Sequence, residues 1–499
     1  MDRHSTIIIG SKSLSIEILN TIATDKSVRV ELSSGAMLAI QKSRKVVEDI
    51  ISSGKIVYGL NTGFGSLKDQ SIEHAQLEQL QENLIRSHAA GTGKPFSESE
   101  VRAAVLIRAN SLAQGYSGVR VELVEKLLEL LNKGMYPFVP EQGSCGASGD
   151  LAPLSHLALV LMGEGELIFN GNRAKTQDLL KHYDFEPIKL QAKEGLALNN
   201  GSSFLTAVAA LNIYQAKKIS QLADRALGLS LEGLMGTLTA FDERIHNIRP
   251  HSGQIKTAEV IRDLCKGSRT IGPGNNYVNI QDSYSLRCAA QVHGPVKQMI
   301  EYVEKVVEVE LNSVTDNPLV FSDTGDILSG GNFHGEPIGL AMDSLCIALT
   351  ELANISERRI AKLIDPNHNN GLPAYLIGSK YLGLNSGFMI MQYTAASLLA
   401  EMKVLSHPVV VDSIPTSANQ EDYVSFAATA SRKCRDILPM LQSIVAIELI
   451  SSAQAVDIRN SDKIGNGNRE TYNFVRESVP FVVDDEAMYV HLENLQKRL

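Results

Sequence analysis

The sequence lacks several features that mark whole classes of protein. Its 499 residues hold 47 Lys and Arg against 56 Asp and Glu, without a run of basic residues, so no nucleic-acid partner is expected. No stretch of about 18 uncharged apolar residues occurs, and the N-terminal apolar run is three isoleucines long. We therefore expect a cytoplasmic protein with neither a signal peptide nor a membrane span.

Cysteine is also scarce. The five cysteines stand at positions 145, 265, 288, 346 and 434, without any C-x-x-C spacing, so neither a disulfide framework nor a zinc knuckle is indicated. His334 and Glu336 lie close together, but no further metal ligand accompanies them at a usual spacing. The sequence therefore predicts no metal site and no diffusible cofactor.

Most of the chain has helical periodicity. The segment 119–131 places Leu123, Leu127 and Leu130 on one face and ends before Gly134, as a helix does. Long patterns that are apolar over more than half of the helix circumference run over 203–225, 288–313, 337–363, 386–404 and 426–452. Short strands are expected only near the start, at 5–9 and 27–32. We predict a mainly α protein, an elongated central bundle of long helices with a small, loop-rich, mixed N-terminal region.

Segments rich in Gly and Asn separate these helices. They lie at 58–66, 141–153, 197–203, 272–287 and 329–337. Loops of this composition on a helical scaffold are where a functional site is expected. The sequence contains neither a P-loop, which binds nucleotides, nor the nucleophile elbow of serine hydrolases. Pro95 follows Lys94 where a P-loop needs Ser or Thr, and Asp150 stands where a nucleophile elbow needs Gly. We expect an N-terminal region, 1–200, and a helical bundle with the C-terminal region, 201–499, in one intertwined unit.

The segment Ala147-Ser148-Gly149 has two interpretations. It is flanked by further glycines at 143 and 146, and an ordinary turn that caps a helix starting near Asp150 accounts for this composition. Glycine also permits a turn so compressed that the amide nitrogen of Gly149 attacks the carbonyl carbon of Ala147. Loss of water from that ring and from Ser148 would leave a methylidene-imidazolone, a strong electrophile.

The sequence around this segment resembles a known family. GASGDLAPLSH (146–156) is similar to the signature of the aromatic amino-acid ammonia-lyases and aminomutases, which make this internal cofactor. Similar blocks follow in the family's order: VYGLNTGFG (57–65), NLIRSHAAG (83–91), EGLALNNG (194–201), IQDSYSLRC (280–288), TDNPLVF (315–321), SGGNFHGEP (329–337), SERRIA (356–361) and DSIPTSANQED (412–422). The resemblance implies a fold like that of the fumarase/aspartase-like ammonia-lyases and a homotetramer whose active sites combine residues from several subunits.

The resemblance also implies roles for individual residues. The methylidene-imidazolone formed from Ala147, Ser148 and Gly149 would be attacked by the substrate amine, which becomes a better leaving group, or alternatively by the aromatic ring of the substrate. Tyr58 matches the general base that takes the β-proton, and Arg287 matches the clamp on the substrate carboxylate. The remaining matched positions are catalytic at Asn200, Tyr284 and Glu421 and substrate-binding at His88, Gln281, Phe333 and Met389.

Substrate choice depends mainly on His88, because Ser87-His88 resembles the histidine-specific branch of the family. An imidazole can exchange hydrogen bonds with His88 and Glu421, whereas an apolar ring would leave both unpaired. Tyr423 stands where the family usually has His after Gln-Glu-Asp. The expected reaction is L-histidine to trans-urocanate and ammonia. The alternatives are an aminomutase, a lyase for tyrosine, phenylalanine or a modified histidine, and a catalytically silent paralogue that binds an amino acid.

Overall fold

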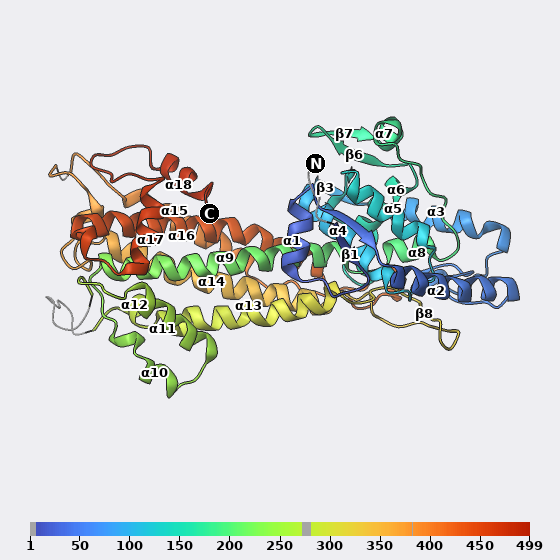
Figure 1. The fold of residues 1–499 in the computed structure, drawn as a ribbon, viewed down its shortest axis with the longest axis horizontal. Helices are drawn as coiled ribbons and strands as arrows, with labels where there is room; N and C mark the ends of the chain where they lie inside the picture. Colours follow the sequence, from blue (N-terminus) through green and yellow to red (C-terminus); the bar gives the residue numbers. More distant parts are fainter. Residues whose placement is uncertain (1–5, 272–280, 382) are drawn as a thin grey trace. The chain divides into compact units, whose positions relative to one another are not determined.

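The structure, a computed structural model, describes residues 6–271, 281–381 and 383–499. It is mainly α-helical, as predicted, and the chain divides into two compact units that each combine three segments. Unit 1 comprises Met1–Tyr214, Val303–Asp343 and Pro408–Arg432, and unit 2 comprises Gln215–Tyr302, Ser344–His407 and Lys433–Leu499. In Figure 1 the colours follow the chain from its N-terminus to its C-terminus, so the segments of each unit can be traced along the long helices. Residues 272–280, the first part of a Gly- and Asn-rich segment, and Ser5 of the first expected strand lie outside the described residues.

The strands of the described residues form small sheets in unit 1. They are β1 (Thr6–Ile9), β2 (Arg29–Leu32), β3 (Thr92–Pro95), β4 (Tyr136–Pro137), β5 (Pro140–Gln142), β6 (Glu166–Phe169), β7 (Asn172–Lys175), β8 (Leu319–Phe321) and β9 (Asp326–Leu328). β1 pairs with β2 in parallel, in the register Thr6 to Arg29, while the orders β3-β5, β4-β6-β7 and β8-β9 are antiparallel. The two N-terminal strands confirm the pattern expected at 5–9 and 27–32.

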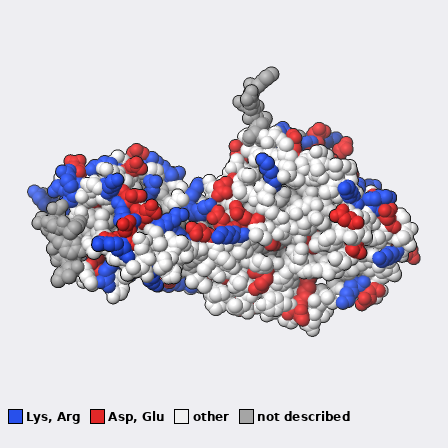
Figure 2. All heavy atoms as spheres, turned by 60° about the horizontal axis from the view of Figure 1, so that its bottom comes forward, with Lys and Arg blue, Asp and Glu red and all other residues white. Residues whose placement is uncertain are grey.

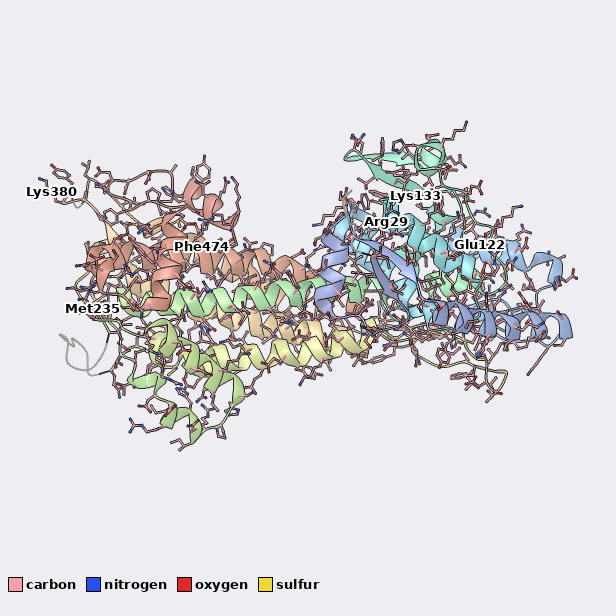
Figure 3. All side chains as sticks on the ribbon, viewed as in Figure 1. Arg29, Glu122, Lys133, Met235, Lys380 and Phe474 are labelled. Carbon is pink, nitrogen blue, oxygen red and sulfur yellow. The ribbon has the colours of Figure 1, made fainter. Side chains whose placement is uncertain are left out.

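Helices make up the rest of unit 1. They are α1 (Ile16–Thr24), α2 (Ser34–Ser53), α3 (Leu77–His88), α4 (Glu98–Ala113), α5 (Val121–Asn132), α6 (Leu151–Leu161), α7 (Thr176–Tyr183) and α8 (Glu194–Asn199), with short 3-10 turns η1 (Gly65–Leu67), η2 (His74–Gln76) and η5 (Ser417–Asn419). α4 is buried from Glu100 to Ala113 and starts in a capping box formed by Ser97 and Glu100. α5 exposes Glu122 near its start and Lys133 at its end, the charge order that the helix dipole favours (Figure 3).

Unit 2 contains the shorter elements η3 (Thr239–Phe241), α10 (Glu243–Asn247), α11 (Ser252–Leu264), α12 (Tyr284–Arg287), η4 (Ala374–Leu376), α15 (Met389–Leu405), η6 (Ser461–Lys463), α17 (Asn466–Arg476) and α18 (Met488–Gln496). Its core includes buried ion pairs. Arg359 and Glu448 pair at 2.5 Å with both side chains fully buried, and His293 lies 2.9 Å from Asp224. Such pairs are costly to break, because removing one partner leaves a buried charge.

The boundary between His407 and Pro408 follows α15, and the other four boundaries between segments of the two units fall inside long helices. These are α9 (Ser203–Gly233), α13 (Ala289–Leu311), α14 (Glu336–Ile364) and α16 (Ala427–Arg459). Each agrees with a long helix expected from the sequence. α14 and α16 contain stretches long and apolar enough to cross a membrane, but 67% and 72% of those stretches are buried inside the protein. Burial of this extent is typical of core helices, which satisfy the same length and composition test.

Candidate active site

Two cavities of unit 1 share five lining residues. They have volumes of about 580 and 840 Å³. Both are lined by Tyr58, Gly65, Ser148, Asn200 and Glu421. The smaller is further lined by His88, and the larger by Ala147 and Phe333. Every predicted site residue of unit 1 except Gly149 therefore lines one cavity or both, and Gly149 is the next residue after Ser148.

The segment Ala147–Gly149 lies in a loop that is held from several sides. The carbonyl of Cys145 accepts a hydrogen bond from the Phe426 amide at 2.9 Å, and the carbonyl of Gly146 accepts one from the Gly335 amide at 3.0 Å. The Ser144 hydroxyl donates to the Gly149 carbonyl at 3.2 Å. These bonds restrain the ends of the tripeptide, while Ser148 remains in the wall of both cavities.

Gly149 packs against Gly201 without room for a side chain on either. Gly149 has a φ of +72°, and a Cβ there would lie 2.2 Å from the Gly201 carbonyl oxygen. That oxygen accepts a hydrogen bond from the Asp150 amide at 2.7 Å. Only glycine combines the left-handed backbone with this close approach. The backbone at Gly149 is therefore confined to a tight turn against Gly201.

Asp150 follows the tripeptide as the N-cap residue of α6, but its carboxylate does not cap that helix. It accepts hydrogen bonds from the Leu205 amide at 2.9 Å and from the Ser144 hydroxyl at 3.1 Å. Burial raises the pKa of Asp150 to about 7, and these hydrogen bonds offset only part of the rise. A helix does start here, as expected if the segment is an ordinary turn that caps a helix. The Asp150 side chain, however, forms its hydrogen bonds outside that helix.

Tyr58 lies in the loop between α2 and η1. Its phenol oxygen accepts a hydrogen bond from the Gly65 amide at 3.4 Å. The arrangement suits a general base that faces a cavity.

Glu421 is held beside Ser148 by an unusual loop. The Ser148 hydroxyl donates to Glu421 Oε1 at 2.7 Å, and the Thr416 hydroxyl donates to Oε2 at 3.2 Å. Between Thr416 and Glu421, residues 417–419 all adopt left-handed φ values of 51°, 52° and 65°, although none is glycine. Backbone strain of this kind costs on the order of 1 kcal/mol or more per residue and concentrates at functional sites. The loop therefore fixes the position of the carboxylate.

His88 ends α3 and lines the smaller cavity. Its Nδ1 lies 2.9 Å from the carbonyl of Leu84, so this nitrogen carries the proton, and Nε2 is left as an acceptor in the neutral ring. Burial lowers the pKa of His88, with the Leu84 carbonyl and Glu421 acting in the opposite direction. A neutral His88 with a free acceptor can accept a hydrogen bond from an imidazole N–H.

Asn200 places an unpaired acceptor beside the tripeptide. The side chain is buried, its Nδ2 donates weakly to the Asn317 carbonyl at 3.5 Å, and within the described residues its Oδ1 has no partner. Neither ring nitrogen of a methylidene-imidazolone would carry a hydrogen, so this acceptor would be left for a donor of the substrate. The observation that suits the tripeptide to the internal group is the glycine contact at Gly149 and Gly201, where no side chain fits.

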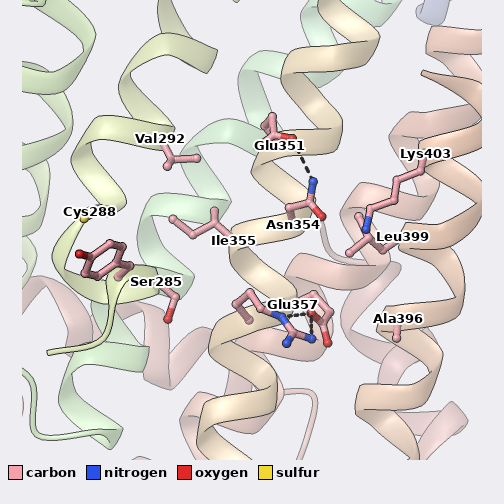
Figure 4. Close-up of a pocket in the computed structure, with 12 residues that line it drawn as sticks. Ser285, Cys288, Val292, Glu351, Asn354, Ile355, Glu357, Ala396, Leu399 and Lys403 are labelled. Atoms are coloured by element: carbon pink, nitrogen blue, oxygen red, sulfur yellow. Dashed lines mark hydrogen bonds and ion pairs between the residues drawn. The ribbon is translucent and has the colours of Figure 1, made fainter. Parts of the chain in front are cut away.

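Three other predicted residues lie together in unit 2. Arg287 donates to Gln281 and stacks over the ring of Tyr284 with 4.7 Å between guanidinium and centroid. Tyr284 is 70% exposed and lies at the edge of a cavity of about 590 Å³ between α12, α13, α14 and α15 (Figure 4). Met389, the first residue of α15, is also in unit 2. None of these four lines either cavity of unit 1 in the described part of the chain.

Several contacts at the site were not anticipated from the sequence. Lys68 donates to Gln420 at 3.3 Å, and the rings of His334 and Tyr423 stack with centroids 6.0 Å apart in the wall of the larger cavity. Arg108 of α4 donates to the Asn200 carbonyl at 2.9 Å. Arg108 carries no distinctive signal in the sequence, because its helix also contains Arg102, Asn110 and Ser111. Across the described ranges, no group of three His, Cys, Asp or Glu side chains is placed to hold a metal ion.

Comparison with known proteins gives concordant results. Residues 14–477 match the family model described as aromatic amino acid lyase. A histidine ammonia-lyase of Caldanaerobacter subterraneus subsp. tengcongensis is 48% identical over 486 residues, which cover 97% of this chain and 95% of that one. The crystal structure of histidine ammonia-lyase from Trypanosoma cruzi matches with a TM-score of 0.91 at 41% identity, over 99% of this chain and 93% of that chain. A Pantoea agglomerans phenylalanine aminomutase matches with a TM-score of 0.94 at 32% identity, over 99% and 98% of the two chains.

Proposed function

The chain belongs to the aromatic amino acid lyase family, and we propose that it eliminates ammonia from L-histidine to give trans-urocanate. The observation that carries this proposal is the cavity in which Ser148, Tyr58, His88 and Glu421 meet. This cavity brings together Ser148 as the precursor of an electrophile, Tyr58 as a base, and two hydrogen-bonding groups for an imidazole, His88 and Glu421. The similarity to histidine ammonia-lyases at up to 48% identity supports the choice of substrate.

The methylidene-imidazolone made from Ala147, Ser148 and Gly149 supplies an electrophile that activates the substrate amino group. The chain's other residues must then remove a weakly acidic β-proton. Tyr58 accepts this proton at its phenol oxygen, which the Gly65 amide holds in the wall of the cavity. Asn200 offers its unpaired Oδ1 to a donor in the same cavity.

The imidazole ring is recognised by hydrogen bonds. His88 Nε2 accepts from the ring, and Glu421, held by Thr416, accepts from the ring or from the amino group. A phenyl ring offers no hydrogen-bond donor to either group, whereas an imidazole N–H does. Phe333 contributes an apolar wall in the larger cavity. These contacts favour histidine over phenylalanine.

The carboxylate of the substrate needs a cation, for which Arg287 is the candidate. We infer a cytoplasmic homotetramer in which Arg287, Gln281 and Tyr284 of one copy complete the cavity of unit 1 in another copy. The exposure of Tyr284 and of apolar side chains on α15, such as Ile390 and Tyr393 at 60% each, supports association of copies. The arginine fork suits a carboxylate through paired hydrogen bonds.

The proposal is tested by ultraviolet absorbance of purified protein with L-histidine, beside the intact mass of the same sample. We expect urocanate to appear and the chain to be lighter by two waters, about 36 Da. Ser148→Ala is the control, because it keeps the backbone but has no hydroxyl to lose, and we expect it to lack both signals. A full-mass wild-type chain would overturn the cofactor, and a light chain without urocanate would overturn histidine as the substrate. Chromatography for a β-amino acid product would reveal an aminomutase.

A further inference from the structure

Arg108 is a fully buried cation whose hydrogen bonds in the described part of the chain all go to neutral oxygens. Its Nη1 donates to the carbonyls of Asn200 at 2.9 Å and Thr315 at 3.4 Å, and its Nη2 donates to the Ser111 hydroxyl at 3.0 Å. Burial lowers its pKa, with Asp316 and Asp150 opposing the shift. An arginine nevertheless stays charged in proteins. A buried charge without a carboxylate partner is costly, so its placement calls for a functional reason.

The guanidinium of Arg108 stands directly behind the turn that presses on the tripeptide. A Cβ on Gly201 would lie 2.1 Å from Arg108 Nη1, and a Cβ on Gly149 would lie 2.2 Å from the Gly201 carbonyl oxygen. Arg108, the Asn200–Gly201 turn and Gly149 are thus packed one behind the other without space for a methyl group between them. The Gly201 oxygen is further fixed by the Asp150 amide at 2.7 Å.

We propose that Arg108 is a positioning residue for formation of the electrophile, because it holds the Asn200–Gly201 turn against Gly149 and so keeps Ala147–Gly149 compressed. The inference rests on the proposed function, since it concerns how the internal group of that function is made. Holding two reacting atoms close together in a fixed geometry can contribute several orders of magnitude to a rate. Without Arg108, the turn at Gly201 can retreat and the tripeptide can relax into an ordinary turn.

The reaction that Arg108 assists needs no oxidant or reductant. The lone pair of the Gly149 amide nitrogen forms a bond to the Ala147 carbonyl carbon, and the carbonyl oxygen takes up the Gly149 amide proton. That hydroxyl leaves with the Ser148 amide proton as the first water, which creates a carbon–nitrogen double bond. The Ser148 hydroxyl leaves with the Cα hydrogen as the second water. The chain becomes lighter by two waters, about 36 Da, without any other change in its atoms.

The test follows this mass loss in variants of α4. Arg108→Lys keeps the charge but loses the fork that reaches Asn200 and Ser111, and Arg108→Met also removes the charge. Arg102→Lys is a matched control, because Arg102 lies on the same helix, is buried, and donates to backbone carbonyls of Ile22 and Leu131 at 2.8–3.1 Å, far along the chain from the tripeptide. Each full-length chain is synthesised without cells, and folded protein is sampled over time for intact mass.

We expect wild type and Arg102→Lys to lose two waters at similar rates, and both Arg108 variants to lose them at least about tenfold more slowly. A purely structural role would lower the yield of folded protein without changing the dehydrated fraction of what folds. Equal rates for Arg108→Lys and Arg102→Lys overturn the inference alone, while a wild-type chain that never loses mass overturns the proposed function with it. If the Arg108 variants do not fold, Ser111→Ala weakens the same anchor more gently, and a wild-type rate in that variant overturns the inference.

Discussion

Burial drives Asp150 and His88, which flank the site on two sides, toward their neutral forms. It raises the pKa of Asp150 to about 7 and lowers that of His88. For His88 the neutral form is the functional one, because only then does Nε2 accept from an imidazole. For Asp150 the ionised form is disfavoured in the folded protein, so the free energy of unfolding of the protein depends on pH.

At Asp150 this dependence has a definite sign. The folded state retains the proton to about pH 7, whereas the unfolded chain releases it near the ordinary pKa of 3.8. Between these pH values the folded state binds more protons, so this group's contribution to the free energy of unfolding falls as pH rises. From pH 5 to pH 7 we expect a loss on the order of 2 kcal/mol from this group.

Asp150→Asn isolates that contribution, because the amide oxygen still accepts from the Leu205 amide but the side chain does not titrate. We expect the melting temperature of wild type, relative to that of the variant, to fall as pH rises from 5 to 7, as measured by differential scanning calorimetry. Other titrating groups cancel in the comparison. A difference that stays constant or grows with pH would show that Asp150 is ionised in the folded protein throughout.

Site residues that stand in a distinctive local sequence were predictable from the sequence. Residues that only hold other parts of the site in place were not. Tyr58 and Ser148 stand in distinctive Gly- and Asn-rich segments, Glu421 stands in the segment 412–422 that resembles the family, and all three line the same cavities. Arg108 stands in a regular helix, and its importance appears only once α4 and the Asn200–Gly201 turn are packed together. Long-range contacts of this kind, 92 residues apart along the chain, leave no local pattern.

Among the elements, the long helices were predicted well because their apolar periodicity is sustained. The pattern at 337–363 became α14, Glu336–Ile364, and the one at 386–404 became α15, Met389–Leu405. The antiparallel pair β6 and β7 was not predicted, although Asn170-Gly171 between them is a strong hairpin signal. Its strands are four residues each, too short for an alternating pattern to stand out against neighbouring helices.

The start of α4 is the element whose local stability matters most for the inference about Arg108. The Ser97 hydroxyl accepts from the Glu100 amide at 3.3 Å, and the Glu100 carboxylate accepts from the Ser97 amide at 2.7 Å. Ser97→Ala removes the first of these bonds, and we expect a loss of about 1 kcal/mol in the free energy of unfolding, measured by denaturant titration. Because the cap lies three turns from Arg108, the mass loss of two waters should persist.

Ser99→Ala is the control for this change, since Ser99 lies in the same turn and its hydroxyl contacts only that of Ser97, at 3.1 Å. We expect Ser99→Ala to stay within about 0.5 kcal/mol of wild type. Equal destabilisation by the two substitutions would mean that the capping box contributes nothing specific to α4.

At the scale of the whole molecule, the surface carries features of an associating protein. Figure 2 shows positive and negative side chains interspersed on the face that it draws, without an area of one sign alone. Exposed apolar side chains recur on long helices, among them Val404 at 76% and Val309 at 68%. Charged surface of mixed sign keeps a protein in solution, while apolar patches on regular helices are suited to contact with further copies.

The proposed sharing of active sites between copies makes a quantitative prediction about mixed assemblies. Tyr58→Phe removes the base in unit 1 and Arg287→Ala removes the carboxylate clamp in unit 2, so each variant alone should be nearly inactive. If Tyr58 and Arg287 of one site come from different copies, random co-assembly of equal amounts restores both wild-type residues in about one quarter of the sites. We expect co-expressed variants to recover activity toward this limit, measured as urocanate formation per chain, and the double variant to recover none. Because a site built from a single copy can never regain both residues by mixing, co-assembled variants as inactive as their parents would contradict the shared site.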